Sequence, residues 1–302
     1  MKFENISVYN FDNALRGMRN PKNSWDKSDS SFGMAHFEEI DDIANDVADA
    51  WIQNKYPDEV PDNYEDLLEH YHDWLIKNGI IQVDEDYCVF AFIGPNDMRL
   101  AQTLIRGGSE HRKFMRQIFV SVDITAPLYW WKEFDTYKVG TTANSTSTMH
   151  KMASKPITMD CFDTDDMVSL YEVDQELTHG TDIDFNANDY TYSFDDADSM
   201  PIEFLNFLED LRLKYLATKD KRYWKELIRW LPESWLQTRT VTMDYENFLA
   251  MCSRGQRRFH KLNEWSGQDD GTQPNFISMS RDLPYAQELI FLDELSKTDG
   301  YY

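Results

Sequence analysis

A short alternating run in the first half of the chain constrains the fold more than any other feature. Between Gln117 and Ile124 every second residue is a β-branched aliphatic residue, which is typical of a strand with one buried face. Pro127 follows, and it suits the first turn of a helix from Leu128 to Lys138 because no N–H is needed there. A second apolar run, Tyr87 to Ile93, predicts another strand. Strands interleaved with helices predict an α+β protein.

Apolar residues at three- and four-residue spacing predict the helices. They are expected at His36 to Tyr56, Tyr64 to Asn78, Ile202 to Leu216, Trp224 to Leu231 and Asp244 to about Trp265. Asn96 is expected to cap a short helix after Gly94-Pro95. The first thirty-odd residues are polar and are expected to be irregular.

Composition narrows the class of protein further. The chain has 302 residues, 41% of them hydrophobic and 14% aromatic, so it is expected to bury a substantial core rather than to be disordered. Its apolar runs are too short to span a bilayer, and the first residues lack the apolar core of a signal peptide. Three widely spaced cysteines suggest inert thiols in a reducing, cytoplasmic environment, with no metal site.

The charge is strongly negative and unevenly distributed. A net charge of −24 argues against binding to duplex nucleic acid, because polyanions repel each other. Thirteen acidic residues and no lysine or arginine lie between Asp160 and Asp198, and this stretch is expected to be a surface insertion. The stretch from Arg106 to Arg116 is instead rich in cations, so a small anionic ligand is expected there.

Two segments contain residue types that bind anions. Gly107-Gly108 precede a short helical turn with His111, Arg112, Lys113 and Arg116. A basic helix start offers free N–H groups to an anion, although a solvated basic turn would have the same composition. The stretch Thr141 to Thr148 is a loop rich in hydroxyls, which bind phosphate or a base edge but also form ordinary turns.

The order of these pieces resembles the core of flavin-dependent thymidylate synthases. In that family a turn with a flavin-contacting histidine precedes a strand, an Ala-Pro pair, an aromatic helix and a Ser/Asn-rich loop. Here Gly108 to Phe114 matches the turn, Phe119-Val120-Ser121-Val122 the strand and Ala126-Pro127 the pair. Further on, Leu231-Pro232, Thr238 to Thr242 and the helix from Asp244 follow in the family's order. The resemblance covers less than half of the chain.

The resemblance implies a central antiparallel sheet with flanking helices and a set of ligand-binding residues. The cofactor-binding residues it implies are His111, Lys113, Lys138 and Arg258. The substrate-binding residues it implies are Asn144, Ser145, Ser147, Arg229 and Arg254. The family's Arg-His-Arg signature is missing. Thr136-Tyr137-Lys138 stands at that place without a gap, or Tyr137-Lys138-Val139 with one residue inserted, and in neither case does a lysine replace the arginine clamp. No catalytic side chain is assigned.

The resemblance also implies an activity, cofactors and an assembly. FAD would be the cofactor of a methyltransferase that converts dUMP or a related uridine nucleotide, with methylenetetrahydrofolate and NADPH as further reactants. The site would be shared between subunits of a homotetramer. Two alternatives are open: a nucleotide- or flavin-binding protein that has lost catalysis, and a phage-associated structural or interaction protein.

The domain organisation follows from where the resemblance begins. Residues 1–85 are expected to form an N-terminal helical extension, and residues 86–302 a domain similar to flavin-dependent thymidylate synthases. The acidic surface insertion would occupy about residues 160–198 of that domain.

Overall fold

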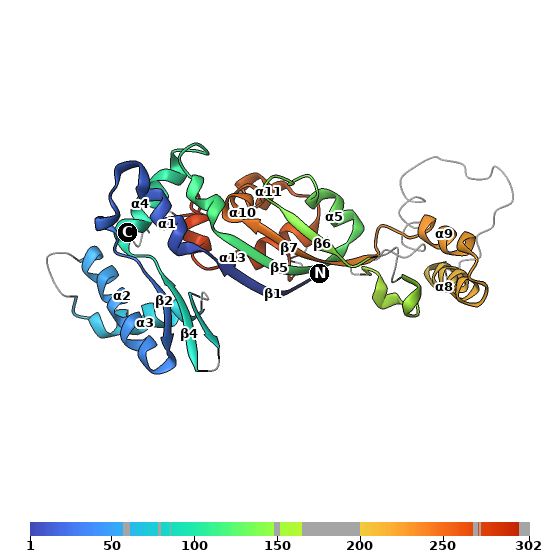
Figure 1. Cartoon of the computed structure of the whole chain (residues 1–302), viewed down its shortest axis with the longest axis horizontal. Helices are drawn as coiled ribbons and strands as arrows, with labels where there is room; N and C mark the ends of the chain where they lie inside the picture. Colours follow the sequence, from blue (N-terminus) through green and yellow to red (C-terminus); the bar gives the residue numbers. More distant parts are fainter. Residues whose placement is uncertain are drawn as a thin grey trace, which may run out of the picture. The chain divides into compact units, whose positions relative to one another are not determined.

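Strands β5 (Phe119–Pro127) and β7 (Leu236–Asp244) form the centre of a four-stranded sheet with the order β1-β5-β7-β6 (Figure 1). The outer strands are β1 (Lys2–Tyr9) and β6 (Thr142–Ser145). The computed structural model describes residues 1–56, 61–77, 80–84, 86–147, 152–164, 200–267, 271 and 273–295. Its mixture of helices and strands confirms the predicted α+β class.

Backbone hydrogen bonds give the direction of the central pair of strands. The carbonyl of Ile118 accepts from the N–H of Tyr245 at 3.0 Å, whereas the N–H of Leu128 donates to the carbonyl of Trp235 at 3.1 Å. The contacts therefore move backward along β7 as β5 runs forward, which only antiparallel strands do. The inward side chains of β5 are fully buried, as the alternating run predicted: Val120, Val122 and Ile124.

The N-terminal residues form regular structure, so the prediction of an irregular start was wrong. Strand β1 lies at the edge of the central sheet and is mostly exposed, which explains why its sequence lacks a clean alternation. Helix α1 (Phe11–Arg19) buries one face through Phe11, Ala14, Leu15 and Met18. Two 3-10 turns follow, η1 (Asn20–Lys22) and η2 (Trp25–Lys27).

A second sheet has the order β2-β4-β3 and is antiparallel. Its strands are β2 (Ser31–His36), β3 (Ile81–Asp84) and β4 (Tyr87–Phe92). Helices α2 (Ile40–Lys55), which follows the turn η3 (Phe37–Glu39), and α3 (Tyr64–Lys77) confirm the predicted amphipathic helices. Residues 1–85 were expected to form a helical extension. They also contain strands β1, β2 and β3, so the segment is not purely helical.

The middle of the chain contains helix α4 (Pro95–Arg106), the 3-10 turn η4 (Lys113–Gln117) and helix α5 (Leu128–Phe134). The residue before α4 is Gly94, and Asn96 lies inside the helix rather than at its cap. The carboxylate of Asp29 accepts from the N–H groups of Asn96 and Asp97 at 2.7 and 3.1 Å. A distant loop therefore caps this helix, which no local pattern indicates.

Five short helices end the described chain: α10 (Tyr245–Met251), α11 (Arg254–Phe259), α12 (Asn263–Ser266), α13 (Phe276–Arg281) and α14 (Ala286–Leu289). The single long helix expected from Asp244 to Trp265 was therefore wrong. Its predicted start is confirmed, because Asp244 caps α10 and forms a capping box with Asn247. The rings of Phe248 and Phe276 stack at 5.7 Å in the core beneath these helices.

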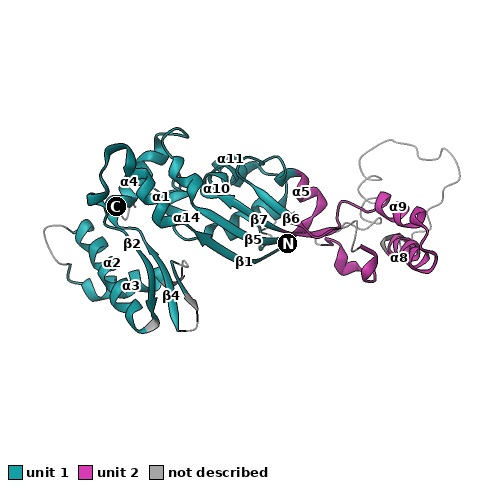
Figure 2. Ribbon diagram, viewed as in Figure 1, with its two compact units in different colours: residues 1–124, 133–144, 240–302 teal, residues 125–132, 145–239 magenta. Residues whose placement is uncertain are grey.

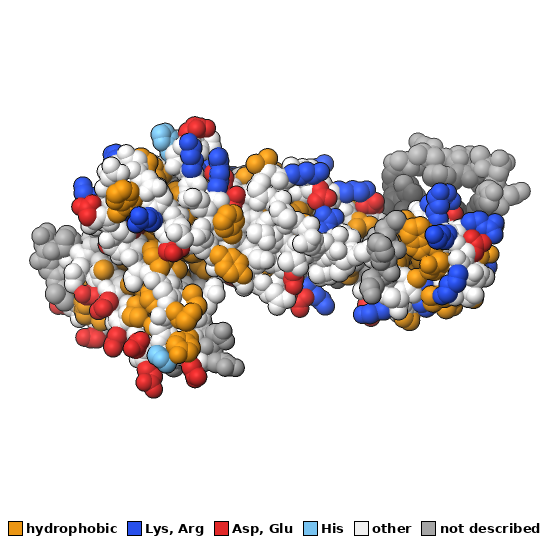
Figure 3. Space-filling view, in the orientation of Figure 1, with side chains coloured by type: hydrophobic (Ala, Val, Ile, Leu, Met, Phe, Trp, Pro, Cys, Tyr) orange, Lys and Arg blue, Asp and Glu red, His pale blue; other side chains and the backbone are white. Residues whose placement is uncertain are grey.

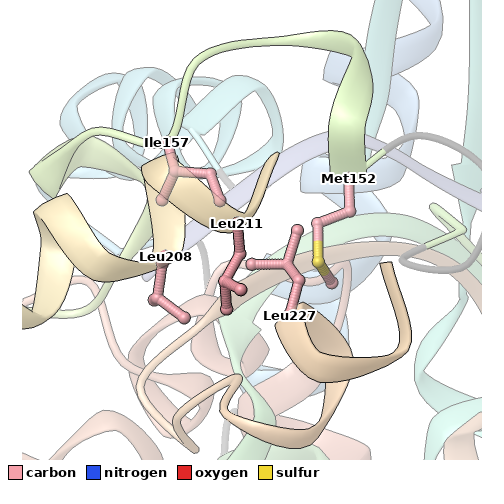
Figure 4. Close-up of a cluster of buried hydrophobic side chains, with 5 residues drawn as sticks. All are labelled: Met152, Ile157, Leu208, Leu211 and Leu227. Atoms are coloured by element: carbon pink, nitrogen blue, oxygen red, sulfur yellow. The ribbon is translucent and has the colours of Figure 1, made fainter. Parts of the chain in front are cut away.

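The chain divides into two compact units (Figure 2). Unit 1 contains residues 1–124, 133–144 and 240–302, and unit 2 contains residues 125–132 and 145–239. In unit 2 the helices α8 (Met200–Thr218) and α9 (Lys221–Arg229) confirm the two helices predicted there, and short turns η5 (Met152–Ser154) and η6 (Met159–Cys161) precede them. Figure 4 shows the buried cluster of this unit: Met152, Ile157, Leu208, Leu211 and Leu227.

Most of the predicted acidic insertion lies outside the described residues, which resume at residue 200. The boundary predicted after residue 85 stays a prediction. Within the described ranges no helix is both long and apolar enough to cross a membrane. Cys88 and Cys252 are buried, Cys161 is half-buried, and all three are free thiols. Burial raises the pKa of the Cys252 thiol to about 12, which fits the prediction of an inert cysteine.

Candidate functional site

The predicted basic turn follows the end of helix α4 at Arg106. Gly108 adopts a φ of +95°, and the N–H of His111 donates to the Gly108 carbonyl at 3.0 Å. A side chain at Gly107 would lie 3.1 Å from the His111 ring, so glycine allows the turn to close on itself. His111 and Lys113 are exposed on this turn.

Two cations of the turn bind the same carboxylate. Glu246, in the first turn of helix α10, accepts from Nε of Arg112 and from Nε of Arg116, both at 3.1 Å. The Glu246 side chain is only 15% exposed, so this double ion pair is shielded from solvent more than a surface pair. Lys113 lies 3.8 Å from Glu110. The basic turn is thus partly committed to internal contacts.

These contacts bring together the two segments in which the family resemblance was found. Glu246 and Tyr245 belong to the second segment, and they bind Arg112, Arg116 and the Ile118 carbonyl of the first. The sequence places these segments more than a hundred residues apart. Their contact supports the proposal that they contribute to one site.

Arg254 lies where the predicted long helix is interrupted. The chain leaves helix α10 at Cys252 and Ser253, and Arg254 is the first residue of α11. It lines two grooves of unit 1. A groove of about 420 Å³, here called the apolar groove, is lined by three arginines, five hydrophobic residues and two other polar residues: Arg106, Arg112, Arg254, Ile105, Leu249, Ala250, Ile290, Leu292, Ser253 and Asp293.

The second groove, here called the arginine groove, has a volume of about 520 Å³. Charged side chains alone line it: Arg254, Arg257, Arg258, Arg281, Asp293 and Glu294. Both grooves are of a size that holds a nucleotide-sized ligand. Arg254 is the one arginine that lines both grooves among the described residues.

Half of the arginine groove is internally neutralised. Arg257 binds Asp293 at 2.5 Å and Glu294 at 2.8 Å, and Arg281 binds Glu294 with both of its terminal nitrogens. The hydrogen bond from Arg281 holds the pKa of Glu294 below its usual value, against the opposing effect of burial. Within the described ranges no carboxylate lies within ion-pair distance of Arg254, Arg258 or Arg106. These three cations are the ones available to a phosphate.

The segment that replaces the family's arginine signature is fixed by contacts to helices α10 and α11. Gln256 donates a hydrogen bond to the Tyr137 hydroxyl, and the Tyr137 ring lies 5.6 Å from that of Trp265. Burial is the largest cause of the raised pKa of Tyr137. Asn247 donates to the Val139 carbonyl at 2.6 Å. Lys138 remains exposed between these anchors and is the one cation that the signature segment offers.

The hydroxyl-rich segment is partly a strand, so its prediction as a loop was wrong. Asn144 and Ser145 are exposed on β6, beside β7, and Ser147 follows the strand half-buried. Because every residue of β6 is exposed, the strand has no apolar alternation by which to recognise it. Residues 148–151 lie outside the described ranges.

The remaining predicted binding residue belongs to unit 2. Arg229 ends helix α9 and binds Glu226 at 2.7 Å, and Glu226 also accepts from the Trp230 indole at 2.8 Å. Of the nine predicted residues, Arg254 and Arg258 line one groove together. The described linings of the two grooves do not include His111, Lys113, Lys138 or Asn144.

The structure also adds residues that sequence reasoning missed. Arg106, Ser253 and Arg281 line the grooves. Arg106 could have been predicted as a binding residue, because it is a cation in the last turn of a helix that two glycines follow. Nothing in the local sequence distinguishes Arg281 in this way. The aromatic run of α5 is not part of a surface site: Trp130 and Trp131 are buried, and the Trp131 indole donates to the Gln237 carbonyl at 2.9 Å. No cluster of three or more metal-ligating side chains occurs in the described ranges.

Comparison with solved structures gives matches at low identity and low TM-score. No family model and no curated protein sequence match the chain. A flavin-dependent thymidylate synthase from Helicobacter pylori, in complex with FAD and dUMP, matches with a TM-score of 0.40 and 12% identity over 84% of this chain and 96% of that chain. A second structure of that enzyme gives a TM-score of 0.40 at 11% identity, over 88% and 98% of the two chains.

The UMP/dUMP methylase PolB from Streptomyces cacaoi, bound with 5-Br UMP, matches with a TM-score of 0.36 and 12% identity over 62% of this chain and 75% of that chain. TM-scores below 0.5 at such identities do not establish membership in a family.

Proposed function

We propose that this chain binds FAD and a uridine nucleotide such as dUMP, and that it is an FAD-dependent nucleotide-modifying enzyme similar to thymidylate synthase. The observation that supports this most directly is the position of Arg254. It lines both the apolar groove and the arginine groove, and no described carboxylate neutralises it. A guanidinium that lines both a groove with hydrophobic residues and a groove with several arginines suits a ligand that combines a base with a phosphate.

The predicted binding residues are cations, hydroxyls and an amide, which are the types of side chain that bind phosphate groups. Ser145, Ser147 and Arg229, which belong to unit 2, stay predictions of the resemblance. In this proposal His111, Lys113, Lys138 and Arg258 hold the cofactor, and Asn144 and Arg254 hold the substrate. Arg106 joins the second group because it lines the apolar groove with Arg254. Bound and reduced, FAD would supply the electrons for converting a one-carbon unit of methylenetetrahydrofolate into a methyl group, with NADPH as the source of reducing power. The protein would orient the reactants and exclude water.

A second candidate function is binding without catalysis, and the state of Tyr137 favours it. Neither alignment to the family, with Thr136-Tyr137-Lys138 or with Tyr137-Lys138-Val139 at the signature, keeps the two arginines. The Tyr137 ring is held by Gln256 and Trp265. A single exposed lysine does not supply the bidentate contacts of an arginine clamp. A protein with this site would retain ligand affinity and lose the positioning that catalysis needs.

The decisive experiment measures binding and turnover separately. FAD binding is followed by quenching of flavin fluorescence, and dUMP binding by calorimetry. Arg254→Gln should weaken nucleotide binding about ten- to a hundredfold, as expected for a charge-assisted hydrogen bond of about 1.5–3 kcal/mol. Arg222→Gln is the matched control, because Arg222 is an exposed arginine of unit 2 that pairs with Asp220. Its affinity should equal that of the unmodified protein.

The outcomes separate the candidates. A colourless protein that binds neither FAD nor dUMP refutes both functions. Binding together with tritium release from 5-labelled dUMP, in the presence of methylenetetrahydrofolate and NADPH, supports the enzyme. Binding without tritium release supports the second candidate. If Arg254→Gln binds both ligands as tightly as the control, the assignment of the site to the two grooves is wrong.

We also propose a homotetramer, which the family resemblance implies. In that family each site is shared between subunits, so residues of the hydroxyl-rich segment would act on a neighbouring subunit's ligand. Sedimentation velocity of the full chain tests this directly. A monomer at micromolar concentration that still binds FAD would contradict a shared site.

A further inference from the structure

Strands β2 and β4 of the three-stranded sheet of unit 1 carry exposed apolar residues on their outer face. Cys88, Phe90 and Phe92 of β4 point into the core, so the alternate residues Tyr87 and Val89 point outward. Val89 is 48% exposed and lies opposite Met34 of β2, which is 67% exposed. Tyr87 is 46% exposed, and its ring lies 4.5 Å from that of His36. Figure 3 shows hydrophobic side chains gathered over these two strands.

This outer face, defined by Met34, His36, Tyr87 and Val89, departs from the usual pattern of an antiparallel sheet. Such a sheet normally places polar residues on the side that faces water. Here the register pairs Met34 with Val89 and His36 with Tyr87, so the outward residues form a continuous strip across two strands. A contiguous apolar strip with a polar border marks an interaction site more often than a random surface does.

The surroundings of the strip are strongly acidic. Residues 37–86, which form helices α2 and α3 and reach the β3–β4 turn, contain sixteen aspartates and glutamates and two lysines. Most of the described acidic side chains of these helices are exposed: Asp41, Asp42, Asp46, Glu65, Asp66, Glu69 and Asp73. In Figure 3 acidic side chains border the apolar strip. The segment accounts for a net −14 of the chain's −24.

This charge determines what kind of partner fits. A nucleic acid or an anionic membrane would be repelled by the acidic border. A second copy bound through the same face would bring two such acidic segments together, which like-charge repulsion opposes. A cationic partner gains on both counts, because its apolar residues cover the strip while its lysines and arginines approach the carboxylates.

We propose that the outer face of the β2-β4-β3 sheet binds a basic segment of another protein, in which apolar residues are interspersed with lysine or arginine. The apolar strip provides the contact area. The acidic border makes binding specific for cationic partners and raises the association rate. The interaction is independent of the nucleotide site and of the function proposed for it.

Two short fluorescein-labelled peptides of equal charge test the proposal by anisotropy with the full chain. One alternates lysine with valine, and the other alternates lysine with serine. The valine peptide should bind at least about tenfold more tightly, because it alone covers the strip, and its affinity should fall as salt is raised. The variant Met34→Ser with Val89→Ser should reduce its affinity to that of the serine peptide.

A matched control variant removes exposed apolar residues elsewhere. Leu213 and Trp230 of unit 2 are 49% and 52% exposed, so Leu213→Ser with Trp230→Ser should leave the preference for the valine peptide intact. Equal urea unfolding midpoints of both variants and the unmodified chain show that folding is preserved. Four results overturn the proposal: no preference between the peptides, a preference that survives Met34→Ser with Val89→Ser, binding to anionic vesicles through this face, or a dimer that this variant dissociates.

Discussion

Glu288 is a buried carboxyl group whose ionisation should lower the stability of unit 1 as the pH rises. It lies in helix α14 with 4% of its surface exposed, and its Oε2 has no hydrogen-bond partner in the described structure. Burial raises its pKa from 4.5 to about 7. The nearby hydroxyls of Tyr245 and Tyr285 are also buried, and neither supplies a positive charge. The carboxyl is therefore more stable as the neutral acid in the folded chain.

The magnitude follows from the difference between the folded and unfolded pKa. A group whose folded pKa is raised stabilises the fold fully below its unfolded pKa and loses that contribution as the pH rises toward the folded value. The shift from 4.5 to about 7 corresponds to a loss of roughly 3 kcal/mol across this window. Between about pH 5.5 and pH 8 the loss should be roughly 2 kcal/mol, because part of it has already occurred at the lower pH.

The substitution Glu288→Gln tests this reasoning, since glutamine keeps the shape and does not ionise. The variant should lack the stability loss, so its free energy of unfolding relative to the unmodified chain should rise by roughly 2 kcal/mol from pH 5.5 to pH 8. Urea unfolding followed by tryptophan fluorescence measures it. Glu110→Gln is the control, because that carboxylate is 85% exposed and should show no such rise.

A direct titration complements the unfolding data. The ¹³C-carboxyl resonance that disappears in Glu288→Gln should titrate near pH 7 in the unmodified chain. A midpoint near the ordinary glutamate value, or a stability difference that does not change with pH, would show that the carboxyl is ionised and solvated in the folded protein. The burial that the structure gives it would then be wrong.

Three further substitutions or modifications have definite expected outcomes. Gly140→Ala should lower the urea midpoint more than Gly108→Ala, because both glycines have positive φ but only at 140 would the new Cβ meet another side chain, at 2.7 Å. Leu208→Ala should cost about 2–5 kcal/mol in unit 2, whereas the exposed Leu213→Ala should change stability by less than about 0.5 kcal/mol. Cys252 should resist iodoacetamide at mildly alkaline pH until urea unfolds the chain, as mass spectrometry of the labelled peptides can show.

The sequence predicted those elements whose burial has a regular period. Strand β5 and helix α2 each bury one face at fixed spacing, so periodicity alone indicated both. Strands β1 and β6 escaped prediction because they lie at the edges of the central sheet and bury little. Their residues are held by hydrogen bonds to a neighbouring strand, and such pairing is not recorded in local sequence.

The helix expected from Asp244 to Trp265 shows a different limit. Its start was predictable because Asp244 is a capping residue with a local signature. Gly255 lies two residues beyond its interruption at Cys252 and Ser253, but an isolated glycine inside a helical pattern does not by itself mark the end of a helix. Long-range packing decides it: the Trp265 indole donates to the Met251 carbonyl at 3.1 Å, and Arg257 donates to that of Cys252 at 2.6 Å. These bonds satisfy carbonyls that a continuous helix would have used itself.

The interruption of that helix matters for the candidate site, because it places Arg254 beside both grooves. In a continuous helix, the direction of the Arg254 side chain relative to Asp244 would follow from the spacing of the two residues alone. The structure instead depends on Glu246, which fastens the start of α10 to Arg112 and Arg116, and on Arg257, which fastens α11 to Asp293 and Glu294. Arg112, Arg116 and Arg257 are thereby engaged in ion pairs and less able to bind a ligand. The same ion pairs hold α10 and α11 in place, and α11 carries Arg254 and Arg258. Among the arginines that line the two grooves, Arg106, Arg254 and Arg258 have no carboxylate within ion-pair distance in the part of the chain that the structure describes, so replacing them should change ligand affinity. Replacing Arg112 or Arg257 should first change stability.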